Sequence, residues 1–326
     1  MNGLKILVTR AWPKEAEERL VAEALGDVTL RDPDTSMSHD EFMAAAETYD
    51  VIMPTVSDKI PAEFYPAAKG KVRIMANYGV GFNHIDIDAA RENGIAVTNT
   101  PDVLTDCTAD LAMGLLLTAA RRIGEGEREV RSNGWAGWRP THMIGKKVTG
   151  ATLGIIGFGR IGQAMARRAH YGFGMRVAFQ DAWQVPDEIK IANGNAEQLG
   201  SVAEVAAQSD FLSLHTPGGA ATYKMINADV FSALKPGAIL VNSARGDVVD
   251  EDALFEALDS GHLTAAGLDV YHNEPALDPR FLSYENIVLA PHLGSATDGT
   301  RAAMGHRAID NLMAFLKGDA PGDLVT

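Results

Sequence analysis

Apolar and polar positions alternate along the first hundred residues in a way that predicts a repeated strand–helix order. Short apolar runs suited to buried parallel strands occur at residues 5–9, 51–53, 72–76 and 95–98. Helical spacing and helix-starting residues between these runs predict helices at residues 13–24, 40–47, 62–68 and 85–92. This order is typical of an α/β unit built on a parallel sheet.

A second α/β unit is predicted beyond a long apolar helix at about residues 103–122. Its strands are expected to start near Thr152, Arg176, Phe211, Ala238, Thr264 and Ile287, which gives the six strands of a Rossmann sheet. Ser201 and Glu204 have the spacing of a capping box, and Asn227 and Asp250 are suited to begin helices. The pattern therefore predicts a second parallel sheet with well-defined helices.

A last helix at about residues 297–316 is long enough to return to the first unit. We therefore expect an α/β protein of two Rossmann-like or flavodoxin-like domains with parallel sheets. The second domain, residues 101–292, is expected to be inserted into a discontinuous first domain of residues 1–100 and 293–326.

A glycine-rich turn follows the first apolar run of the second unit directly. Gly157, Gly159 and Gly162 have the Gly-x-Gly-x-x-Gly spacing, and a helix-forming segment follows. The first glycine permits a sharp turn, the second admits a pyrophosphate and the third lets the helix pack on the strand. Asp181 comes nineteen residues after Gly162, where an acid can accept hydrogen bonds from ribose hydroxyls. The segment predicts dinucleotide binding, although an acid there can also simply cap its own turn.

The composition of the chain limits the classes of molecule that it is expected to bind. The chain has 326 residues, 46% of them hydrophobic, so it can bury an ample core. Its net charge is −14, and it has no basic patch that would favour binding to nucleic acid or to an anionic membrane. Its single cysteine, Cys107, cannot form an internal disulfide and lies in an apolar helix pattern. Because no long apolar segment stands at residues 1–9, we expect a cytoplasmic protein.

Three predicted strand ends carry further chemistry, and ligands of open α/β sheets bind at such ends. Arg245 follows a buried strand and is flanked by small residues, so its planar fork is suited to a carboxylate. Asp269 and Glu274 follow the next strand, and His292 follows the last. A carboxylate beside an imidazole favours the protonated ring, so Glu274 and His292 together predict a proton donor. The alternative for Arg245 is a surface residue in a turn.

Five other histidines are better explained by structural positions. His84, His170, His262 and His306 fall on predicted helices or their ends, and His215 precedes a Thr-Pro turn. His272 and Glu274 are close in sequence, but no third ligand has suitable spacing, so no metal site is expected.

Taken in order, these motifs resemble the D-isomer-specific 2-hydroxyacid dehydrogenase family. The resemblance covers nearly the whole chain and rests on residues 78–86, 105–112, 157–162, 242–246, 273–275 and 291–295. It implies that Arg245, Glu274 and His292 are the catalytic trio and that the backbone N–H groups of Val80 and Gly81 hold the substrate carboxylate. It further implies a cofactor site lined by the glycine turn and by Thr108, Arg160, Ile161, Asp181, Thr216, Ala244, Asp269 and Gly294. By the same resemblance, residues 101–292 are the NAD-binding Rossmann domain, and residues 1–100 and 293–326 are the discontinuous substrate (lid) domain.

Within the family, residues 133–145 look like the glyoxylate and hydroxypyruvate reductase branch. That resemblance implies a homodimer formed through residues 121–150, with Trp138 binding substrate across the interface. Many NADPH-using members carry a basic residue where this chain has Asp181-Ala182-Trp183, so we expect NAD(H) to be preferred and NADP(H) to remain possible. The segment Tyr171–Gly174 carries one extra residue relative to the branch.

Two alternatives stay open at this point. The first is a dehydrogenase for another 2-oxo acid, of the D-lactate or phosphoglycerate type, although the latter would usually add basic residues for the phosphate. Formate dehydrogenases of the superfamily have glutamine where this chain has Glu274, which argues against that activity. The second alternative is a binding protein. A dinucleotide-sensing corepressor-like binding protein shares the fold and even the trio.

Overall fold

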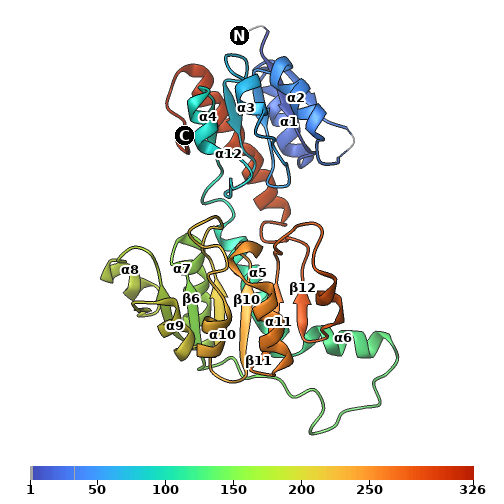
Figure 1. Cartoon of the computed structure of the whole chain (residues 1–326), viewed down its shortest axis with the longest axis vertical. Helices are drawn as coiled ribbons and strands as arrows, with labels where there is room; N and C mark the ends of the chain where they lie inside the picture. The colour runs from blue at the N-terminus through green and yellow to red at the C-terminus, as the bar shows by residue number, and fades with distance from the viewer. Residues whose placement is uncertain (1–2, 33) are drawn as a thin grey trace. The chain divides into compact units, whose positions relative to one another are not determined.

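The computed structural model describes residues 3–32 and 34–326. The chain forms two compact units, Met1–Leu104 with Ala296–Thr326, and Thr105–Ser295. The junctions therefore lie a few residues beyond the limits expected from the sequence, 100 and 292. Figure 1 shows a sheet with flanking helices in each unit.

The first unit contains a parallel five-stranded sheet in the order β2-β1-β3-β4-β5, the strand order of flavodoxin-like folds. The strands are β1 (Lys5–Val8), β2 (Asp27–Leu30), β3 (Val51–Met53), β4 (Ile74–Ala76) and β5 (Ala96–Thr98). The helices are α1 (Lys14–Ala22), α2 (His39–Thr48), α3 (Phe64–Ala67), α4 (Ile87–Glu92) and α12 (Asp298–Lys317). Sequence analysis missed β2, because this edge strand is largely exposed and has no apolar run.

The C-terminal segment is part of the first unit. Helix α12 lies close against α1, since a Cβ on Gly305 would come within 2.5 Å of the Ala16 Cβ. Beyond the helix, Leu324 forms an antiparallel bridge with Thr98, and the Val325 N–H donates to the Val97 carbonyl. The chain end thus covers the free edge of β5.

The second unit contains a parallel seven-stranded sheet in the order β12-β11-β10-β9-β6-β7-β8. The strands are β6 (Thr152–Ile156), β7 (Arg176–Gln180), β8 (Glu197–Gln198), β9 (Phe211–Leu214), β10 (Ala238–Asn242), β11 (Leu263–Leu268) and β12 (Ile287–Leu289). This is the Rossmann order with one further strand. The expected count of six strands is wrong because β8, two polar residues at the edge, carries no apolar signal.

Helices cover both faces of the second sheet, which is why β6, β9 and β10 are buried throughout. On one face, α5 (Thr105–Ala120) and α7 (Arg160–Arg167) contribute to a core with Leu153 and Ile155. On the other, α9 (Val202–Gln208), α10 (Ala228–Ala233) and α11 (Glu251–Asp259) pack against Leu212 and Leu240. Further helical segments of this unit are α6 (Ile123–Arg131), α8 (Asp187–Ala192), η2 (Gly246–Val248) and η3 (Pro279–Ser283).

Several local predictions are corrected. The helix expected at 103–122 ends at Ala120, and Arg122, with φ of 54°, separates it from α6. A π-helical turn, η1 (Arg168–Gly172), follows α7 directly and includes the start of the segment Tyr171–Gly174. Asp250 precedes α11 but its side chain makes no cap bond, because it pairs with Lys224 at 3.1 Å.

Two predicted helix starts are confirmed by their cap bonds. Ser201 accepts from the Glu204 N–H and Asn227 accepts from two N–H groups of α10. The Ser201 capping box is incomplete, however, because the Glu204 carboxylate accepts from the Gly200 N–H instead of from Ser201. Across residues 3–32 and 34–326, no helix is both long and apolar enough to span a membrane.

Candidate active site

The glycine turn between β6 and α7 shows why its first and third positions require glycine. Gly157 has φ of +88°, and a Cβ there would lie 2.7 Å from the backbone of His215. A Cβ on Gly162 would lie 2.2 Å from the Gly157 carbonyl oxygen, so α7 packs directly on the turn. In contrast, a Cβ on Gly159 would meet nothing within 4 Å. The turn is therefore tightly packed on its protein side and open at the second glycine.

The open side of this turn is suited to a pyrophosphate. Gly159 is the N-cap of α7 and has no side chain of its own to cap the helix. The N-terminal end of a helix and its dipole favour an anion, and Arg160 and Ile161 form the start of α7. The residues present therefore fit a dinucleotide.

Asp181 stands at the end of β7, beside the glycine turn. Its Oδ2 accepts from the Phe158 N–H at 2.6 Å, and its Oδ1 accepts from the Trp183 N–H at 3.0 Å. The carboxylate thus both braces the glycine turn and caps its own turn, the alternative weighed above. Each carboxylate oxygen can accept more than one hydrogen bond, so capacity for ribose hydroxyls remains.

Arg245 projects from the turn that follows β10. Asn242 shapes this turn, since its Oδ1 accepts from the Ala244 N–H at 3.0 Å and its Nδ2 donates to the Arg245 carbonyl at 2.9 Å. Gly246 is obligatory, because a Cβ there would come within 1.9 Å of the Tyr271 backbone. Burial lowers the pKa of Arg245, against the opposing charges of Glu274 and Asp247, yet a guanidinium remains charged in proteins.

His292 and Glu274 form the predicted pair. His292 Nδ1 lies 2.7 Å from Glu274 Oε2, and Glu274 Oε1 accepts from the Tyr271 N–H at 2.9 Å. Burial alone would raise the pKa of Glu274, but the hydrogen bond and charge of His292, the Tyr271 N–H and the charge of Arg245 outweigh it and lower that pKa. An ionised carboxylate only accepts, so Nδ1 carries a hydrogen and Nε2 is the nitrogen that can hand over a proton.

Asp269 fixes the turn that carries His292. Its carboxylate accepts from the N–H groups of Leu293 and Gly294, at 2.6 and 2.8 Å, and its carbonyl accepts from the His292 N–H at 3.0 Å. Burial raises the pKa of Asp269, opposed by these N–H donors and by the charge of His292. Thr108 on α5 donates its hydroxyl to the Gly294 carbonyl at 2.9 Å. His292 itself has φ of 56°, a strained value for a residue with a side chain.

Thr216 follows β9, beside the glycine turn. The residue before it, His215, differs from His292 in its hydrogen-bond partner. His215 Nε2 lies 2.9 Å from the Ser213 hydroxyl, and desolvation lowers the pKa of His215 to about 4. Its ring is therefore neutral in the physiological range. Of these two strand-end histidines, His292 is the one that hydrogen-bonds a carboxylate, that of Glu274.

The strand ends thus bring together most of the predicted residues of the second unit. Arg245, Glu274 and His292 follow the adjacent strands β10, β11 and β12, while the glycine turn, Asp181 and Thr216 follow β6, β7 and β9. Val80 and Gly81 lie in the first unit, after β4. Trp138 lies on the segment between α6 and β6 with 82% of its surface exposed.

Sequence reasoning missed residues that shape the site without carrying its obvious chemistry. Asn242 was quoted only as part of a motif, and Asp247, whose Oδ2 accepts from the Gly219 N–H at 3.0 Å, was not considered. Asn77 and Asn99, discussed below, also bond to functional backbone. The available signal was a polar residue at the end of a buried apolar run, as at Asn77 and Asn242.

Sequence comparison relates this chain to a known protein family. The family model described as D-isomer specific 2-hydroxyacid dehydrogenase, NAD binding domain, matches residues 113–294. The chain belongs to this family. It is accordingly an oxidoreductase acting on the CH–OH group of 2-hydroxy acids, with a nicotinamide dinucleotide as cofactor.

Its relatives point to the glyoxylate reductase branch. A glyoxylate reductase of Thermococcus onnurineus (strain NA1) is 42% identical over 325 residues, covering 98% of this chain and 95% of the relative. A glycerate dehydrogenase of Hyphomicrobium methylovorum is 37% identical over 318 residues, covering 98% of each. Among solved structures, an NADPH-dependent glyoxylate/hydroxypyruvate reductase from Sinorhizobium meliloti in complex with NADP and malonate has a TM-score of 0.87 and 34% identity, covering 99% of this chain and 97% of that one.

Proposed function

We propose that this protein reduces glyoxylate or hydroxypyruvate to the 2-hydroxy acid, with NADH as the preferred cofactor. The observation that carries the proposal is the arrangement at the ends of β10, β11 and β12, where a cationic fork at Arg245 accompanies a histidine paired with an ionised carboxylate. The relatives named glyoxylate reductase support this choice among 2-oxo acids.

Each member of the trio then has one task. Arg245 binds the carboxylate of the 2-oxo acid and polarises its carbonyl oxygen, since the planar guanidinium can bond two oxygens at once. His292 donates a proton from Nε2 to that oxygen, while Glu274 keeps the ring oriented and charged. The bound nicotinamide cofactor supplies the hydride. We also propose that the N–H groups of Val80 and Gly81 bind the substrate carboxylate.

The preference for NADH rests on Asp181. Its carboxylate is held in place by two backbone N–H groups and so cannot swing away from a ligand bound at the glycine turn. A 2′-phosphate on the adenosine ribose would meet this negative charge, whereas a 2′-hydroxyl could donate to it. The Sinorhizobium relative is NADPH-dependent, so the assay must include both cofactors.

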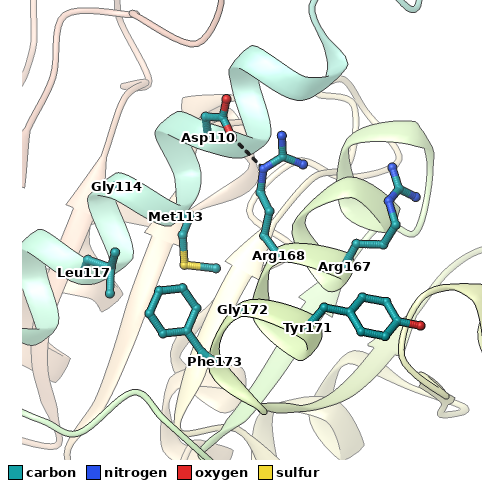
Figure 2. A pocket seen from close by; sticks show the side chains of 9 residues that line it. All are labelled: Asp110, Met113, Gly114, Leu117, Arg167, Arg168, Tyr171, Gly172 and Phe173. Atoms are coloured by element: carbon teal, nitrogen blue, oxygen red, sulfur yellow. Dashed lines mark hydrogen bonds and ion pairs between the residues drawn. The ribbon is translucent and has the colours of Figure 1, made fainter.

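We further propose a homodimer that covers the apolar surface of α5 and of residues 121–150. Helix α6 has no buried residue, and Trp135 and Trp138 are 55% and 82% exposed. Nearby, a pocket of about 600 Å³ lies between α5 and η1, where Met113, Leu117 and Phe173 gather (Figure 2). A surface of this kind on one chain favours a second copy as its partner. The proposal includes Trp138 as a substrate contact in the partner subunit.

One panel tests the function. The purified protein is assayed with glyoxylate, hydroxypyruvate, pyruvate and a bulky apolar 2-oxo acid, each with NADH and with NADPH. We expect the highest kcat/KM for glyoxylate or hydroxypyruvate with NADH. A preference for pyruvate or for the bulky acid would replace the substrate assignment, and NADH binding without turnover of any acid would favour a dinucleotide-sensing protein. Light scattering at micromolar concentration tests the dimer, since a mass of 34.8 kDa would show a monomer.

A further inference from the structure

The loop Gly79–Gly81 after β4 has every one of its carbonyl groups tied to the body of the first unit. The Asn77 amide, through Nδ2, donates to the carbonyls of Gly79 and Gly81, both at 3.0 Å. The Asn99 Nδ2 donates to the Val80 carbonyl at 2.9 Å, and the Thr100 N–H donates to the Gly79 carbonyl at 3.0 Å. Two asparagine side chains therefore hold three consecutive carbonyls.

Because a peptide is planar, the hydrogen bonds to these carbonyls also determine the direction of the neighbouring N–H groups. In a planar trans peptide the carbonyl of one residue and the N–H of the next point in opposite directions. The Gly79 carbonyl points toward Asn77, so the Val80 N–H points away from Asn77. The Val80 carbonyl points toward Asn99, so the Gly81 N–H points away from Asn99. Neither N–H has an acceptor within residues 3–32 and 34–326, and both residues are partly exposed.

The two asparagines are themselves firmly anchored. Asn77 is 0% exposed, and its own N–H donates to the Thr98 carbonyl at 3.0 Å. The Asn99 backbone is fixed on both sides, because its N–H donates to the Asp323 carbonyl at 3.2 Å and its carbonyl accepts from the Asn311 Nδ2 at 3.0 Å. The C-terminal segment thus braces the residue that orients the Gly81 N–H.

We propose that Asn77 and Asn99 are positioning residues that preset the N–H groups of Val80 and Gly81 as a donor pair for the carboxylate of the 2-oxo acid. This inference rests on the proposed function. The two N–H groups need no reorganisation when the substrate binds, because the hydrogen bonds from the asparagines already fix their orientation. It favours carbonyl compounds that carry a carboxylate over those that do not, and neither asparagine touches the substrate.

Two substitutions test the proposal. Asn99→Ala removes one amide donor and keeps the backbone bonds to Asp323 and Asn311. Asn77→Asp keeps the shape of the side chain but sets a carboxylate oxygen against two carbonyl oxygens. The matched control is Asn93→Ala, since Asn93 lies in the same unit and its Nδ2 also donates to a backbone carbonyl, that of Ala89 at 2.9 Å.

The readout is the split between substrate binding and the other steps. For Asn99→Ala and Asn77→Asp we expect the KM for glyoxylate and the inhibition constant of oxamate to rise roughly tenfold or more, as for a weakened hydrogen bond to a charged group. The NADH dissociation constant and kcat/KM for methylglyoxal, a carbonyl compound without a carboxylate, should stay at the wild-type value. Asn93→Ala should change none of these quantities.

The possible outcomes distinguish a failure of the positioning role from a failure of the proposed function. If Asn77→Asp does not fold, as judged by circular dichroism, Asn99→Ala decides. A folded Asn99→Ala with unchanged KM and oxamate inhibition overturns the positioning role, and so does an equal loss toward glyoxylate and methylglyoxal, which would show a merely structural role. Failure of the wild type to reduce any 2-oxo acid would overturn the proposed function instead, and oxamate binding to the NADH complex, measured by calorimetry, would still decide the role of the asparagines.

Discussion

Replacing Glu274 by Gln is the sharpest test of the proton-donating pair, because it removes a charge while keeping the shape of the side chain. In the wild type, Glu274 accepts from two donors, His292 Nδ1 at 2.7 Å and the Tyr271 N–H at 2.9 Å. Its pKa is lowered, so it is ionised at neutral pH and above. A glutamine has a single acceptor oxygen and no charge, so His292 loses its counter-ion.

The expected magnitude follows from the geometry. A hydrogen bond to a charged group contributes about 1.5–3 kcal/mol. Because 36% of the His292 side chain and 34% of the Glu274 side chain are exposed, solvent screens the pair and about 1.5 kcal/mol is the better estimate. One pH unit corresponds to about 1.4 kcal/mol. The pairing should therefore contribute about one pH unit to the position of the alkaline limb of the pH–rate profile.

The assay is the pH dependence of kcat/KM for glyoxylate with saturating NADH. We expect the alkaline limb of the Glu274→Gln profile to lie about one pH unit below that of the wild type, with activity better preserved at low pH. Glu285→Gln is the matched control, because it removes the same charge from an exposed residue paired with Arg128. An alkaline limb that does not move in Glu274→Gln would refute the pairing as the source of the proton.

Three further predictions concern the other residues of the site. Arg245→Ala should raise KM for glyoxylate and lower kcat, with a combined loss in kcat/KM of roughly a hundredfold or more, and unchanged steady-state kinetics would remove Arg245 from the site. His292→Gln should lower kcat by roughly 10²–10⁴ with NADH binding retained, measured by titration of NADH fluorescence, whereas a twofold loss would point to another acid. Asp181→Ser should raise kcat/KM with NADPH and lower it with NADH, relative to a wild-type preference of roughly a hundredfold; if neither value changes, Asp181 only braces its turns.

Local features were readable from the sequence because their physical causes are local. The Gly157–Gly162 turn requires a backbone that only glycine adopts easily, and buried parallel strands need apolar residues on both faces. These two signals were enough to predict two α/β units and the strand ends where the polar residues collect. They were silent about β2 and β8, since edge strands bury little and carry no apolar run. The break at Arg122 was also hidden, because nothing in the local pattern demands a positive φ there.

Only the tertiary structure decided what each functional residue is bonded to. Asp181 was predicted as a ribose acceptor, but its two backbone donors come from Phe158, in the turn after a different strand, and from Trp183. Asn77 and Asn99 lie after separate strands, and their common attachment to one loop depends on the parallel pairing of β4 with β5 and on the C-terminal segment beside β5. Hydrogen bonds between residues distant in sequence produce no periodic pattern in the sequence. Each depends on how the strands are positioned, and the strands are brought together by burial of apolar surface elsewhere in the fold.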